Sequence, residues 1–217
     1  MQTKTLKNKV LFTVILLTLA IFGAKFAAQP IAQATTGTPL AKNQLIPETL
    51  RDIAQDELTE FGDQPYPNTV APTRIEDLLP YAHGAKILSS EGESVVYSSP
   101  DSNPYTASLM RSAGMNPQDG STDVTVVTES GDIAVQAALR WECAWISEYV
   151  RAGRAGNDQA VQEALTQLER FPSLEAIRKY NPELGAGHAA DVLPRLRQGD
   201  QDFAQYWLNG SCSGLLH

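Results

Sequence analysis

Residues 132–152 read Asp-Ile-Ala-Val-Gln-Ala-Ala-Leu-Arg-Trp-Glu-Cys-Ala-Trp-Ile-Ser-Glu-Tyr-Val-Arg-Ala, and this stretch decides the fold. Apolar side chains recur at helical spacing on nearly every side of it, a pattern typical of a helix that is buried on several sides. We therefore expect the central helix of the domain here. Trp141 and Trp145 are one helical turn apart, and we expect both to be core residues rather than a ligand platform.

Shorter amphipathic segments follow the central helix. They predict helices over 157–172, 173–180, 191–199 and 202–208. Asn157, Ser173 and Asp191 are suitable N-cap residues for the first three. The last helix should dock on the core through an aromatic face that contains Phe203, Tyr206 and Trp207. Short turns between these helices predict a C-terminal antiparallel helical bundle.

The half of the chain before residue 132 mixes helical and strand patterns. Helices are expected over 47–62 and 105–113, with a short one that opens in a Thr73–Glu76 capping box. The apolar runs 85–88 and 94–98 flank a glycine-containing turn and predict a small β-hairpin, and 123–128 predicts a further strand. The predicted fold class is mainly α (α+β), and residues 47–217 should form a single exported globular domain.

The first 34 residues have the layout of an export signal. Three lysines precede the uncharged, mostly apolar run 10–24, and the small-residue site Ala32-Gln33-Ala34 follows. A run of 15 residues is shorter than the roughly 20 that span a bilayer, which favours a cleaved signal peptide. Extension through Lys25 to Ala28 would instead give an N-terminal membrane anchor. Residues 35–46 are small and polar and predict a flexible stalk.

The charge of the chain excludes one class of partner. Residues 1–34 carry four lysines and no acidic residue, so the remainder holds 13 basic and 25 acidic residues and a net charge of -12. Phosphate binding needs a concentrated basic surface, so no nucleic-acid partner is expected. The membrane would be a partner only through the N-terminal segment, if that segment stays uncleaved.

Both cysteines, Cys143 and Cys212, follow the leader. An even cysteine count in an exported protein predicts a disulfide, although two buried free thiols are the alternative. The bond would close a loop of about 70 residues and contribute roughly 4 kcal/mol. Cys212 also sits in a Gly210-Ser-Cys-Ser-Gly214 sequence, but a nucleophile elbow needs a strand before it and a helix after it, and neither is expected here.

Two carboxylates could carry acid chemistry. Glu142 lies on the buried helix, and burial of a lone carboxylate favours the protonated form that an acid catalyst needs. The alternative is a structural ion pair with an arginine such as Arg140 or Arg178. Glu129 lies near the start of the same helix, but one glutamate does not establish glycosidase chemistry.

No cofactor is predicted, and the metal signals are weak. An EF-hand is excluded, because its glycine and glutamate are missing from their required positions. Asp119, Asp123 and Glu129 could still form an irregular calcium site. His83, His188 and His217 show no metal-ligand spacing. The glycine-rich stretch 185–190 predicts a flexible loop between helices, with His188 as a solvated loop residue.

The sequence therefore favours an exported or membrane-tethered cell-envelope protein that acts as a non-enzymatic protein-interaction module. Its partner would be another envelope protein. A carboxylate-dependent extracellular hydrolase and a small-ligand or cation binder are the alternatives. A deep pocket lined by Glu142 would favour the hydrolase, whereas an exposed apolar patch would favour the interaction module.

Overall fold

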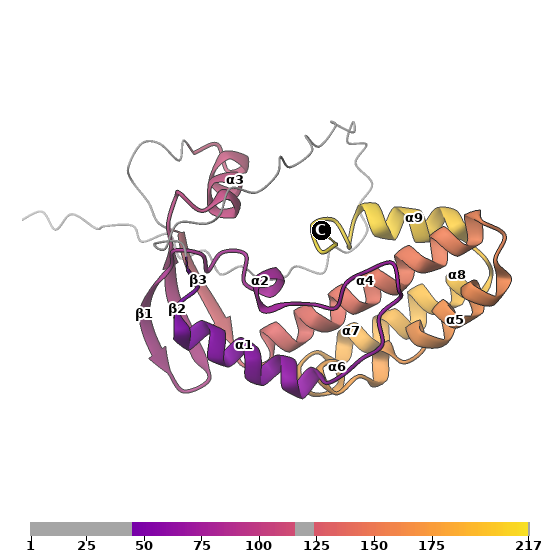
Figure 1. Cartoon of the computed structure of the whole chain (residues 1–217), viewed down its shortest axis with the longest axis horizontal. Coiled ribbons are helices and arrows are strands. Elements are labelled where there is room, and N and C mark those ends of the chain that lie inside the picture. Colours follow the sequence, from indigo (N-terminus) through magenta and orange to yellow (C-terminus); the bar gives the residue numbers. More distant parts are fainter. Residues whose placement is uncertain (1–44, 116–123, 217) are drawn as a thin grey trace, which may run out of the picture.

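The computed structural model describes residues 45–115 and 124–216 of the chain, so the predicted leader and residues 35–44 of the predicted stalk lie outside it. The described part is mostly helical and carries a small antiparallel sheet, as the sequence predicts (Figure 1). Its α-helices are α1 (Glu48–Phe61), α2 (Ile75–Leu78), α3 (Pro104–Ser112), α4 (Asp132–Arg154), α5 (Asp158–Leu168), α6 (Glu175–Tyr180), α7 (Pro182–Gly187), α8 (Leu193–Arg197) and α9 (Gln201–Asn209).

Helix α4 is the axis of the fold. It runs from the sheet to the far end of the helical part, as Figure 1 shows. Helices α1, α5, α6 and α9 pack against it. Trp141, Trp145 and Tyr149 are buried in the core, which confirms the prediction of a central helix with apolar residues on several sides.

The start of α4 is fixed by a side chain from α1. The backbone N–H of Gly131 donates to one carboxylate oxygen of Glu57 at 2.9 Å, and those of Ile133 and Ala134 donate to the other at 3.0 Å each. The first N–H groups of a helix have no partner within it, and their dipoles attract an anion. Glu57 therefore joins α1 to α4, and it also provides hydrogen-bond acceptors for the free N–H groups at the start of α4.

Only glycine fits at position 131. Its φ of 90° lies in the left-handed region, and a Cβ placed there would come within 2.2 Å of the Tyr180 ring. The close packing of Tyr180 on this turn holds α6 against the start of α4.

The sheet consists of β1 (Lys86–Glu91), β2 (Ser94–Ser99) and β3 (Val124–Glu129), paired antiparallel in that order. The predicted hairpin and the predicted strand are therefore both confirmed, as β1–β2 and β3. Val95, Tyr97 and Val126 lie on the inner face and join the core. On β1 the register shifts between Ile87 and Ser89, which leaves Leu88 as a bulge.

The predicted loop over 185–190 is wrong. A π-helical turn, His188–Val192, connects α7 directly to α8. Asn181 caps α7 by accepting a hydrogen bond from the N–H of Leu184, so the helix begins well before the predicted cap at Asp191. Pro194 follows the π turn, where the wider backbone spacing tolerates its missing N–H.

Three further predictions from the sequence are wrong. Two concern helix caps, and one concerns a residue that was expected to dock on the core. The Ser173 hydroxyl donates to Arg170 O within a 3₁₀ turn, and α6 begins only at Glu175. At the start of α2, the Asp77 carboxylate accepts a hydrogen bond from the backbone N–H of Arg74, and the predicted capping box of Thr73 and Glu76 does not form. On α9, Tyr206 is 73% exposed and does not dock, whereas Ala204 is buried and Phe203 and Trp207 pack on the core at their edges.

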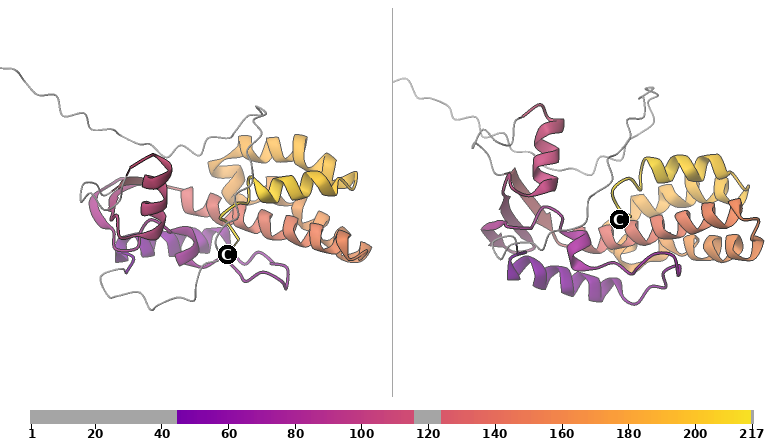
Figure 2. Two further views of the ribbon diagram at one scale, coloured as in Figure 1. Left: turned by 90° about the horizontal axis from the view of Figure 1, so that it is seen from above. Right: turned by 45° about the horizontal axis from the view of Figure 1, so that its top comes forward.

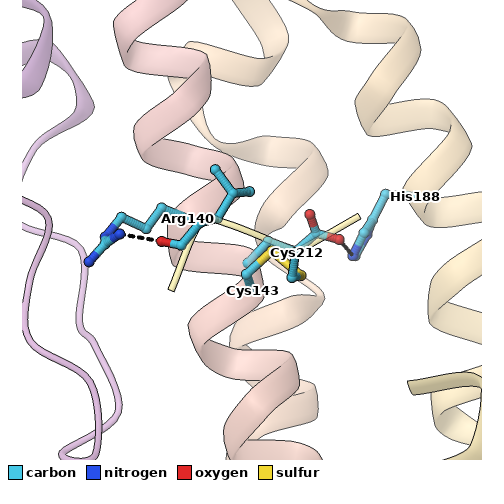
Figure 3. Close-up of a disulfide and its surroundings, with 6 residues drawn as sticks. Arg140, Cys143, His188 and Cys212 are labelled. Atoms are coloured by element: carbon cyan, nitrogen blue, oxygen red, sulfur yellow. Dashed lines mark hydrogen bonds and ion pairs between the residues drawn. A yellow bond between two sulfur atoms is a disulfide. The ribbon is translucent and has the colours of Figure 1, made fainter. Parts of the chain in front are cut away.

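The predicted disulfide between Cys143 and Cys212 is confirmed, with a Cα–Cα distance of 5.5 Å (Figure 3). It ties the segment after α9 to the middle of α4. Because the two cysteines are 69 residues apart, the bond encloses every helix from α5 to α9.

Candidate functional site

Glu142 has a buried partner, but it is a histidine. His188 Nε2 lies 3.2 Å from Glu142 Oε1, and the two residues are 3% and 2% exposed (Figure 3). The predicted arginine partner is therefore wrong, because Arg140 pairs with Asp77 and Arg178 with Glu175. The π turn carries His188 inward from the stretch that was expected to be a solvated loop.

The surroundings of this pair are closed. The Phe171 ring lies 4.7 Å from the His188 ring, centroid to centroid, and the disulfide neighbours Glu142 on α4. Among the described residues no hydrogen bond reaches either ring nitrogen of His188 or Glu142 Oε1, so the contact between the two side chains is what compensates their burial. The arrangement suits a structural contact in the core better than an acid catalyst.

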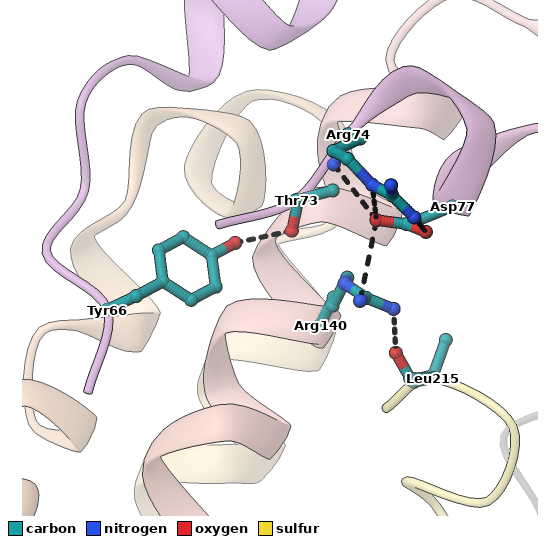
Figure 4. A network of polar contacts seen from close by, with 6 residues as sticks. All are labelled: Tyr66, Thr73, Arg74, Asp77, Arg140 and Leu215. Atoms are coloured by element: carbon teal, nitrogen blue, oxygen red, sulfur yellow. Dashed lines mark hydrogen bonds and ion pairs between the residues drawn. The ribbon is translucent and has the colours of Figure 1, made fainter. Parts of the chain in front are cut away.

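Arg140 gathers three parts of the chain around α4. Its guanidinium lies 3.4 Å from Asp77 on α2 and donates a hydrogen bond to the carbonyl of Leu215 near the C-terminus (Figure 4). Arg74 also binds Asp77, at 3.0 Å. Desolvation acts to raise the pKa of Asp77, but the hydrogen bonds from Arg74 and the charge of Arg140 outweigh it, and the pKa lies below its ordinary value.

An extended segment over residues 62–73, which we call the strap, crosses α4 in front of its two tryptophans. The carbonyl of Pro65 accepts hydrogen bonds from the indole N–H groups of Trp141 at 2.7 Å and Trp145 at 3.0 Å. The two indole rings meet edge to face, with centroids 6.5 Å apart. Further along the strap, the hydroxyls of Tyr66 and Thr73 are 2.5 Å apart (Figure 4), and burial raises the pKa of Tyr66.

An open pocket of about 690 Å³ lies between the strap and the C-terminal half of α1. It is lined by Gln55, Leu58, Thr59, Phe61, Gly62, Asp63, Gln64, Pro65, Tyr66, Pro72 and Thr73. Neither Glu142 nor Glu129 is among these residues. A pocket lined by the buried Glu142 carboxylate would favour a hydrolase, and this pocket is not lined by that residue.

The described residues give no support to the calcium site or to another metal site. Glu129 is exposed at the end of β3, and Asp119 and Asp123 lie outside the described residues. Within 45–115 and 124–216, no three side chains of His, Cys, Asp or Glu come together in a way that could hold a metal ion. In the same ranges, no helix is both long and apolar enough to cross a membrane.

Apolar side chains gather on the surface around α3. Leu45, Tyr105 and Leu109 are exposed by 61%, 46% and 37%. The Tyr81 ring meets the Tyr105 ring edge to face at 6.2 Å, and the carbonyl of Leu45 accepts a hydrogen bond from the N–H of Gly84, three residues after Tyr81. We call Leu45, Tyr81, Tyr105 and Leu109 the α3 corner.

The α3 corner is held in place by Asn103, the N-cap of α3. Its side-chain oxygen accepts from the N–H groups of Tyr105 and Thr106, and its amide donates to the carbonyls of Pro80 and His83. Figure 2 shows α3 standing at one end of the sheet, away from the helices around α4. Sequence reasoning identified the helix but not this surface, because Asn103 and the 80–84 turn become neighbours only in the fold.

No protein-family model matches this chain, and neither a curated protein nor a solved structure matches it significantly.

Proposed function

We propose that this chain is an exported or membrane-tethered cell-envelope protein whose globular part is a non-enzymatic interaction module. In this proposal residues 1–34 direct export or anchor the chain, residues 35–44 form a stalk, and residues 45–217 form one domain with a C-terminal antiparallel helical bundle. The stalk ends earlier than the sequence predicts, because Ile46 is buried in the core and the carbonyl of Leu45 accepts a hydrogen bond from the N–H of Gly84. The binding surface is the α3 corner, and its partner is another envelope protein.

The exposure of the α3 corner carries the proposal. Single exposed apolar residues are common on proteins, but a contiguous group is typical of an interaction site. Tyr105 and Leu109 lie one helical turn apart on α3, and Tyr81 extends the group from the neighbouring turn. Tyrosine is enriched in protein interfaces, since its ring provides contact area and its hydroxyl stays hydrogen-bonded.

The charge around the corner indicates what kind of surface it binds. Residues 102–115 contain no acidic side chain, although the whole chain has a net charge of -8. Arg111 is exposed on α3 and belongs to none of the ion pairs among the described residues. The partner should therefore present an apolar surface with an acidic group beside it.

Burial of Glu142 against His188 supports a non-enzymatic role. A general acid must come within hydrogen-bond reach of its substrate, and this carboxylate is 2% exposed and engaged with a buried histidine. The hydrolase alternative therefore loses Glu142, which was its main candidate for an acid catalyst.

Site-specific photo-crosslinking in the producing cells tests the proposal. A photoreactive phenylalanine at position 109 should give an adduct with one exported protein, identified by mass spectrometry. The same group at position 206, which is more exposed, should not give that adduct. Arg111→Glu should remove it while the melting temperature stays unchanged. Equal adducts from positions 109 and 206, or an adduct unaffected by Arg111→Glu, would refute a specific α3-corner interface.

A further inference from the structure

Among the described residues, strand β1 is an uncovered edge of the sheet. Its residues Lys86-Ile-Leu-Ser-Ser-Glu91 are exposed except for Ile87, which is half-buried. In the described chain β1 pairs with β2 on one side only, and Figure 1 shows it as the outermost strand. An open edge presents a row of unpaired backbone groups that can bind a further strand.

The register shows which backbone groups of β1 face outward. Glu91 and Ser94 flank the two-residue turn and form its closing pair. Because alternate residues of an antiparallel strand direct their N–H and C=O groups to opposite sides, those of Ser90 point away from β2. The bulge at Leu88 shifts the alternation, so that Lys86 faces β2 and Ile87 faces outward.

We propose that β1 pairs with β1 of a second copy of this chain, antiparallel and about a two-fold axis perpendicular to the sheet. Full overlap places Lys86 opposite Glu91 of the second copy, and Ile87 opposite Ser90 of the second copy. This pairing is consistent with the pleat. Lys86 and Glu91 pair with Ser98 and Ser94 on the outer face, while Ile87 and Ser90 pair with Tyr97 and Val95 on the inner face.

Charge complementarity favours β1 of a second copy as the strand that pairs with this edge. Lys86 and Glu91 take part in none of the ion pairs among the described residues. The two-fold pairing brings each lysine beside a glutamate at both ends of the interface. A lysine and a bulge on an edge strand discourage pairing with arbitrary strands, so Lys86 and Leu88 favour the one strand that supplies a matching glutamate.

Leu88 lies at the middle of the paired strands. It is 57% exposed at the bulge, and full overlap places it opposite Ser89 of the second copy, with the two Leu88 side chains on the diagonal across the two-fold axis. The proposed dimer pairs residues 86–91 of the two copies, and none of these residues belongs to the α3 corner. The proposed dimer therefore does not depend on the proposed function, and either can fail alone.

Sedimentation of the protein, purified as the producing cells export it, tests the dimer. The wild type should show a reversible monomer–dimer equilibrium between about 1 µM and about 1 mM. Lys86→Glu and Glu91→Lys each place like charges opposite each other at both ends, and each should weaken the dimer on the order of tenfold. The two variants change the net charge in opposite directions, so a general charge effect would not weaken both.

Mixing supplies the decisive readout. Lys86→Glu and Glu91→Lys should form a heterodimer when combined, and the double variant should dimerise as the wild type does. Glu93→Lys, in the adjacent turn, is the matched control and should leave the equilibrium unchanged. Circular dichroism should show an unaltered fold throughout. A wild type that remains monomeric at every concentration, or single variants that self-associate normally, would overturn the proposal, as would a dimer that Glu93→Lys weakens equally.

Discussion

At the scale of single residues, Glu57 joins two helices through three hydrogen bonds of one side chain. It lies on the apolar stripe of α1, and its carboxylate accepts all three hydrogen bonds that fix the start of α4. Glu57→Ala leaves these N–H groups without partners and should lower the free energy of unfolding by about 2–4 kcal/mol. Urea unfolding measures the loss. The exposed Asp52, on the same helix, is the control, and Asp52→Ala should change stability by less than about 0.5 kcal/mol.

Glu142 and His188 should behave as a coupled pair. Removing one partner leaves the other buried without compensation, so Glu142→Leu and His188→Leu should each cost about 3–5 kcal/mol. The double variant removes both polar groups and should cost clearly less than the sum of the single losses. A thermodynamic double-mutant cycle measures this coupling. Additive losses would show that the two side chains do not depend on each other.

The lowered pKa of Asp77 predicts that the stability of the fold depends on pH. Its pKa is lower in the folded protein than the ordinary 3.8, because Arg74 and Arg140 outweigh the effect of desolvation. The stabilisation is thus complete above the unfolded value and is lost as the pH falls through the folded value. Asp77→Asn should lower the melting temperature near neutral pH, and the difference from wild type should shrink toward about pH 2. A difference that stays constant with pH would contradict this assignment.

At the scale of helices and strands, the strap and α4 depend on the two tryptophans. Trp141→Ala removes a fully buried ring and a hydrogen bond to Pro65, and should cost roughly 3 kcal/mol or more. Trp141→Phe keeps most of the apolar contact and loses the indole N–H, so it should cost about 1 kcal/mol of hydrogen bonding plus a smaller packing loss. Thermal unfolding of both variants separates the two contributions. An unchanged melting temperature for Trp141→Ala would place the ring on a surface.

The elements that the sequence predicts well are those set by local pattern. The helix around Trp141, the hairpin from 85 to 98 and the cap at Asn157 each follow from spacing over a few residues. The errors fall where a side chain binds a partner other than the one that the local pattern predicts. Ser173 and Thr73 have the chemistry of N-caps, but their hydroxyls bind Arg170 O and Tyr66 instead. The π turn is likewise set by the packing of His188 on Glu142, which no local pattern encodes.

The candidate sites divide in the same way. Disulfide pairing followed from the count of cysteines, because only one pair was available. The burial of Glu142 followed from its place on an apolar helix, whereas its partner came from a stretch whose glycines resembled a loop. The α3 corner was not predicted, since it combines residues from 45 to 109 that come together in the fold through Asn103, Gly84 and the contact between the Tyr81 and Tyr105 rings.

For the whole molecule, the disulfide between Cys143 and Cys212 should be the largest covalent contribution to stability. Its loop of 69 residues corresponds to roughly 4 kcal/mol by chain entropy, so reduction should lower the unfolding free energy by about that amount. Mass spectrometry of a non-reduced digest should show the linked peptides. Two freely alkylated thiols in natively exported protein would rule the bond out.

The central claim is that the α3 corner is covered by a partner where the protein works. Hydrogen–deuterium exchange of the protein in its envelope fraction, compared with the purified protein, tests this most directly. Amides of residues 81–84 and 105–112 should exchange more slowly in the envelope fraction, while those of the exposed face of α5 should exchange at the same rate in both. Equal exchange at the α3 corner in the two preparations, or protection confined to α5, would contradict the claim.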